Sequence, residues 1–190
     1  MMEKRRPLVI TSLVLAVLLI TTGVAFGLGS GAVNQGAESP TEGNFSVVSG
    51  GKNNNIPTSG DFAAIGGGEN NLAQGTHSTI GGGLGNRASA AVATVSRGEK
   101  NTASGTSSTA SGGIANTASG LSSTIIGGGH QNTASAERST IGGGRLNTAS
   151  GFKSTIAGDR LNAASGNESA IGGGRLRGCL RRGGGANMEL

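Results

Sequence analysis

Aromatic side chains are nearly absent from this chain. Its 190 residues include four Phe and no Trp or Tyr, whereas 38 residues are Gly. Large apolar side chains fill most protein cores, so the available side-chain volume excludes an ordinary layered core. Proline is also rare, with three residues, and glycine does not recur at every third position. The composition therefore excludes collagen as well.

Residues that carry chemistry are equally scarce. Cys179 is the only cysteine, so no disulfide can form within the chain. Neither His77 nor His130 has a visible orienting partner, and the two aspartates, Asp61 and Asp159, fall in different parts of the repeat described below. General acid–base catalysis needs such a partner, and calcium-binding β-rolls need a regular aspartate after glycine. We expect no enzyme activity, no cofactor and no metal site.

A long apolar run occurs only at the N-terminus. Three basic residues at 4–6 precede an uncharged apolar run over residues 8–26. This order is typical of a secretory signal peptide, and a run of this length can also remain in the membrane as an anchor. We expect residues 1–26 to be a hydrophobic helix that acts as signal peptide or signal anchor. Residues 27–44 are then a linker, and the rest of the chain is exported.

A repeat of about fifteen residues fills most of the remaining chain. The segment "STIGGGRLNTASG" from Ser139 is followed by "STIAGDRLNAASG" from Ser154. The apolar residue of the "STI" motif recurs in steps of 15 residues, with one step of 17 and one of 16. These apolar residues are the predicted core anchors: Val48, Ile65, Ile80, Val95, Ala110, Ile126, Ile141, Ile156 and Ile171. A second column consists of asparagines: Asn55, Asn71, Asn86, Asn101, Asn116, Asn132, Asn147 and Asn162.

Fifteen residues are too few for a helical hairpin but suffice for two short strands and two turns. The "STI" motif predicts a strand with Ser and Ile inside and Thr outside, and the glycine triplet after it permits a tight corner. We therefore expect an all-β fold, a parallel β-roll or β-solenoid of about nine 15-residue coils over residues 45–174. Residues 175–190 break the repeat and are expected to form an irregular tail, which reflects a cap, a truncation or a frameshift.

Two outward columns are candidate binding surfaces. In the last three coils, the position four residues after the anchor is occupied by Arg145, Arg160 and Arg175. These arginines would stack roughly 5 Å apart and attract a polyanion. The other column is formed by the outward threonines and is a candidate interface or binding surface: Thr79, Thr94, Thr109, Thr124, Thr140 and Thr155. Thr124 belongs to this column only if Ile125, and not Ile126, is buried.

The alternation of "STIGGG" with "NTASG" resembles the head repeats of trimeric autotransporter adhesins, the YadA-like left-handed parallel β-roll. The segments "AAIGGG" from Ala63 and "SAIGGG" from Ser169 are similar to the strand of that family. The resemblance implies a homotrimer at the cell surface that binds host matrix, other cells or a surface. Members of the family also carry a coiled-coil stalk and a C-terminal barrel, and the residues after Gly174 resemble neither.

The expected function is that of an exported adhesin-type repeat protein that mediates cell adhesion by multivalent binding. Its expected partners are further copies of the chain and a matrix or polyanionic surface ligand, with no specific nucleic acid and no membrane contact beyond the N-terminal segment. Two alternatives stay open. The flat threonine column also suits an ice-binding solenoid, and exposed solenoid ends suit a self-assembling structural fibre.

Overall fold

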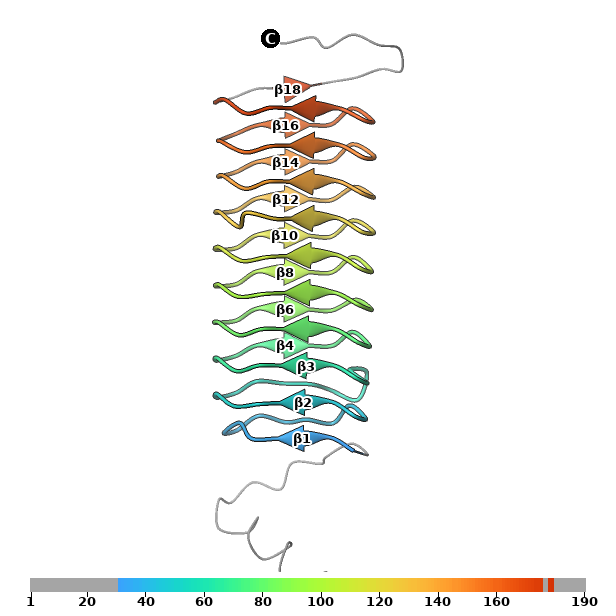
Figure 1. The fold of residues 1–190 in the computed structure, drawn as a ribbon, viewed down its shortest axis with the longest axis vertical. Coiled ribbons are helices and arrows are strands. Elements are labelled where there is room, and N and C mark those ends of the chain that lie inside the picture. The colour runs from blue at the N-terminus through green and yellow to red at the C-terminus, as the bar shows by residue number, and fades with distance from the viewer. Residues whose placement is uncertain (1–30, 176–177, 180–190) are drawn as a thin grey trace, which may run out of the picture.

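The computed structural model describes residues 31–175 and 178–179, which form a parallel β-solenoid of about nine coils (Figure 1). From β3 onward, each coil contributes one two-residue strand to each of two sheets that face one another, and the two earlier coils contribute a strand to the first sheet alone. The predicted fold class is therefore confirmed. The predicted hydrophobic helix and signal segment at residues 1–26 lie outside the described residues. No helix within the described part of the chain is long and apolar enough to span a membrane.

All strand pairs in both sheets are parallel, and each strand pairs with its equivalent one coil away. The first sheet has ten strands: β1 (Val33–Asn34), β2 (Val47–Val48), β3 (Ala64–Ile65), β5 (Thr79–Ile80), β7 (Thr94–Val95), β9 (Thr109–Ala110), β11 (Thr124–Ile125), β13 (Thr140–Ile141), β15 (Thr155–Ile156) and β17 (Ala170–Ile171). The second has eight: β4 (Leu72–Ala73), β6 (Arg87–Ala88), β8 (Thr102–Ala103), β10 (Thr117–Ala118), β12 (Thr133–Ala134), β14 (Thr148–Ala149), β16 (Ala163–Ala164) and β18 (Gly178–Cys179).

A third ladder of single bridges runs along the connection from the first sheet to the second, on the left of Figure 1. We call it the edge column. Its members each bridge to the next coil in a parallel sense. They are Ala37, Lys52, Glu69, Leu84, Glu99, Ile114, His130, Arg145, Arg160 and Arg175.

The core between the two sheets is thin and regular. From β2 to β17 the first sheet buries Ile or Val, except for Ala110, and the second buries a column of alanines that runs from Ala73 to Ala164. The strand alternation explains this pattern, because neighbouring residues of a strand point to opposite sides. A coil that buries so little apolar surface is stable only when it stacks on other coils.

One core anchor was predicted wrongly. Ile125 is fully buried and pairs with Ile141, whereas Ile126 is 59% exposed. The extra residue of the sixteen-residue coil lies in the corner between β11 and His130, where no two-residue strand restricts the backbone. The remaining predicted anchors, from Val48 to Ile171, are buried.

The asparagine column also begins one residue earlier than predicted. Asn54, and not Asn55, is buried and bonded to Asn71. The two extra residues of the seventeen-residue coil lie in a turn after Ile56, where the Gly60 N–H donates to the Pro57 carbonyl at 2.8 Å. The asparagine therefore keeps its distance of six residues from the anchor.

The β-roll extends beyond both predicted boundaries. Strand β1 lies in the predicted linker 27–44 and pairs with β2. Strand β18 lies in the predicted irregular tail, yet its backbone pairs with β16. Arg175 also bridges to Arg160. Parallel pairing depends on the backbone, so it tolerates the loss of the repeat's side chains at both ends.

Candidate functional site

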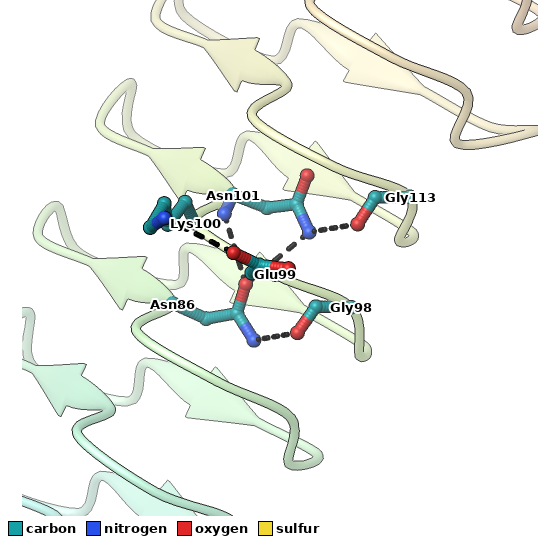
Figure 2. Close-up of polar contacts among 6 residues, drawn as sticks. All are labelled: Asn86, Gly98, Glu99, Lys100, Asn101 and Gly113. Carbon is teal, nitrogen blue, oxygen red and sulfur yellow. Dashed lines mark hydrogen bonds and ion pairs between the residues drawn. The ribbon is translucent and has the colours of Figure 1, made fainter.

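Buried asparagines fix the spacing between the coils and so align their outward residues. The Asn101 N–H donates to the Asn86 side-chain oxygen at 2.9 Å, and the Asn101 Nδ2 donates to the Gly113 carbonyl at 2.9 Å. Figure 2 shows Asn86 and Asn101 in successive coils, each directed at a glycine carbonyl. The sequence predicted this column only as a recurrence in step with the anchors, and its burial was not predicted. Its strict recurrence was the available signal.

The edge column brings the three predicted arginines together. Arg145 bridges to Arg160, and Arg160 bridges to Arg175, so the three residues lie in successive coils. We call these three residues the basic edge. The coil spacing of about 4.8 Å sets the separation of their backbones. Arg145 and Arg175 are exposed, and Arg160 is half-buried.

No carboxylate forms an ion pair with the basic edge within the described residues. The ion pairs found there join Lys52 to Glu38, Lys100 to Glu99 and Arg138 to Glu137. The nearest aspartate in sequence, Asp159, accepts a hydrogen bond from the Gly174 N–H at 2.6 Å. The three guanidinium groups therefore have no ion-pair partner in this part of the chain, although the Asp159 carboxylate beside them lowers the net charge of the surface by one.

Arg160 also contains an unused hydrogen-bond donor. Its Nε is shielded from solvent and has no partner among the described residues. A shielded donor without a partner is costly, so a turn of the side chain that exposes Nε to water or to a ligand would relieve this cost.

The predicted threonine column lies on the outer surface of the first sheet. Backbone pairing aligns each of its threonines with the next, and Thr124 belongs to it because Ile125 is buried. The residue that follows the anchor on this face is small in most coils, as at Gly142 and Ala157. Ile126 is a large exposed exception, so it interrupts an otherwise flat face.

The second sheet carries a hydroxyl surface that was not predicted from the sequence. Its strands place threonines in register, each followed two residues later by an exposed serine. The recurring "TAS" was the available signal, because Thr and Ser flank the buried alanine and point outward together. The pairs are Thr102 and Ser104, Thr117 and Ser119, Thr133 and Ser135, and Thr148 and Ser150.

An aromatic stack on the opposite connection was also missed. Phe45 and Phe62 stack with ring centroids 5.3 Å apart, and Phe62 stacks on His77 at 4.9 Å. Each of these residues lies three positions before its anchor, in the turn that leads into the first sheet. The coil spacing matches the distance at which offset rings stack.

The described residues contain no group of three or more His, Cys, Asp or Glu side chains that could hold a metal ion. His77 and His130 lie on different connections and are separated by several coils.

Comparisons with known proteins add no assignment to this geometry. No protein-family model and no curated protein sequence matches the chain.

Proposed function

We propose that the chain is an exported, surface-displayed adhesin-type β-roll that acts by multivalent binding. The observation that carries the proposal is the register of the parallel sheets, which repeats the same outward side chain from coil to coil. Each contact of this kind is weak. A ligand with its own repeat, such as a matrix fibre or a cell surface, would engage many of them at once.

The proposed assembly is a homotrimer of β-rolls. The resemblance to trimeric adhesin heads supports it, and so does the thin core, because a single coil buries little apolar area. Faces built from Thr, Ser, Ala and Gly let another sheet approach closely. Association would then stabilise coils that contribute little stability of their own.

Sedimentation equilibrium and matrix binding of the full-length chain test the proposal. We expect a particle with three times the mass of one chain, and retention on immobilised extracellular matrix that rises with the density of the matrix. A monomeric mass would contradict the trimer. Retention no greater than that of a heat-unfolded sample would contradict the adhesin function.

The hydroxyl rows of the second sheet favour a second candidate, an ice-binding face. Thr117 and Ser119 lie about 7 Å apart along the strand, and equivalent residues repeat about every 4.8 Å between coils. Such a two-dimensional hydroxyl array suits an ordered water lattice. Thermal hysteresis that disappears in Thr117→Tyr but persists in Thr140→Tyr, on the other sheet, would support this function. A wild-type chain without thermal hysteresis would exclude it.

A further inference from the structure

We infer that the basic edge is a binding site for a linear sulfated glycan. The inference rests on the proposed function, because a protein displayed outside the cell meets such polymers there. It goes further by naming the chemistry of the ligand and the residues that bind it: Arg145, Arg160 and Arg175.

The spacing of the three arginines suits a charged polymer rather than a small anion. Successive bridges place the residues along one line, with about 4.8 Å between their backbones. Two like charges at this separation repel by about 1 kcal/mol in water and by more near a protein surface. A line of sulfate groups bound along the edge would replace this repulsion with attraction at every coil.

The chemistry of the guanidinium group favours a sulfate ligand. Arginine presents a planar fork of donors that binds an oxyanion through two parallel hydrogen bonds. At Arg160 the Nε donor is shielded from water and has no partner among the described residues. A sulfate can bond to the terminal nitrogens of Arg160, and a turn of the side chain that exposes Nε would let the sulfate satisfy this donor as well.

Neighbouring side chains leave the arginines available and add an apolar surface. The Asp159 carboxylate bonds to the Gly174 N–H, and no ion pair forms with the basic edge in the described part of the chain. Leu146 is 37% exposed and follows Arg145 directly, while the half-buried Leu161 follows Arg160. These leucines offer aliphatic contact to the C–H groups of sugar rings.

The same edge does not suit single-stranded nucleic acid. Proteins that bind single strands stack the bases on aromatic side chains. The described phenylalanines, Phe45, Phe62 and Phe152, lie in connections from the second sheet to the first, on the right of Figure 1. The basic edge lies on the left, where His130 is the single ring in the described edge column, so the bases of a strand bound along the three arginines would not find a series of rings to stack on.

Heparin affinity chromatography of the full-length chain tests the inference. The triple variant Arg145→Ala, Arg160→Ala, Arg175→Ala is compared with a matched variant that replaces three other exposed arginines: Arg87→Ala, Arg97→Ala, Arg138→Ala. Both variants lose three positive charges, and circular dichroism establishes that both remain folded. We expect the basic-edge variant to elute at much lower salt, while the matched variant elutes near the wild type.

The salt dependence measures how many arginines contact the polymer. Each charge contact that is lost lowers the slope of log Kd against log salt by about one, so the basic-edge variant should lose about two to three units of slope. Equal losses in the two triple variants would overturn the inference, because general charge attraction would then explain the retention. Unchanged retention of the basic-edge variant would overturn it as well.

Two further ligands test the class of polymer. The protein should bind fully desulfated heparin much more weakly than heparin. It should also elute from an immobilised DNA single strand of equal charge at lower salt than from heparin. DNA that binds as tightly as heparin would overturn the choice of a sulfated glycan. Sedimentation of the same samples tests the proposed trimer independently of the glycan site. A monomeric protein that loses heparin retention only in the basic-edge variant would support the site and contradict the trimer.

Discussion

The Asn101 side-chain oxygen accepts two hydrogen bonds from Asn116, one from its backbone N–H at 3.0 Å and one from its Nδ2 at 3.2 Å. The Asn116 Nδ2 also donates to the Gly112 carbonyl at 2.7 Å and to the Gly129 carbonyl at 3.1 Å. Both asparagines are fully buried. A polar residue inside so thin a core is stable only because neighbouring coils satisfy it, so this ladder links the stability of each coil to that of the next.

Asn116→Ala should be strongly destabilising. The substitution removes the acceptor of the Asn132 N–H and Nδ2 and a donor to the Gly112 carbonyl, and all of these groups lie in the buried ladder. Unpaired buried groups of this kind cost 1 to 3 kcal/mol each, so we expect a loss of about 2 to 4 kcal/mol in the free energy of unfolding. Urea denaturation followed by circular dichroism measures it, and a loss below about 0.5 kcal/mol would contradict the role of the ladder.

Ser108→Ala is the matched substitution in a second buried polar column, the serines that directly precede most strands of the first sheet. Ser108 is fully buried, but its hydroxyl has no hydrogen-bond partner among the described residues. Replacing an unsatisfied hydroxyl with a hydrogen loses no bond, so we expect the free energy of unfolding to stay within about 0.5 kcal/mol of the wild type or to rise. The same urea titration applies. A loss as large as that of Asn116→Ala would indicate a bonded hydroxyl.

The sequence predicted those features that a period controls. The apolar step and the alternation of Ser, Thr and Ile were enough to predict the two sheets, the inward Ile and the outward Thr. The edge column followed as well, because a residue at a fixed offset from the anchor must stack.

The errors occurred where the period is interrupted. Ile125 and Ile126 are chemically equal candidates for the core, and the choice between them depends on whether the strand or the corner absorbs the extra residue. Asn54 and Asn55 pose the same problem in the seventeen-residue coil. The burial of the asparagines was missed because the polarity of Asn suggests a turn, whereas the repeat gives each amide a partner above and below.

Two glycines of the corners should respond oppositely to alanine. Gly113 has a φ of +81°, and a Cβ there would lie 2.1 Å from the Gly129 carbonyl oxygen of the next coil. Gly158 has no atom within 4 Å of such a Cβ. We expect Gly113→Ala to separate two coils and lower the thermal midpoint markedly, and Gly158→Ala to leave it nearly unchanged. Thermal unfolding measures the midpoints of the two variants, and equal midpoints would contradict the close stacking at Gly113.

Ala110→Val should stabilise the β-roll. Ala110 occupies the anchor position that Val95 and Ile125 occupy in the neighbouring coils, and the apolar core divides into two clusters at this level. Two added carbons between these larger side chains should contribute about 1 kcal/mol. Chemical denaturation measures the gain. A loss of stability would mean that the coil has contracted around Ala110 and has no room for valine.

His130→Arg should lengthen the basic edge by one coil. His130 bridges to Arg145 in the edge column, so an arginine there would be the fourth in line. If the edge binds sulfate groups one coil at a time, the variant should elute from heparin at higher salt, with the slope of log Kd against log salt increased by about one. Ser122→Arg adds the same charge on the opposite connection, at the position that Arg138 occupies one coil later with the same positive φ. We expect this control to leave the slope unchanged, and an equal increase in both variants would show that net charge, and not the line of arginines, determines retention.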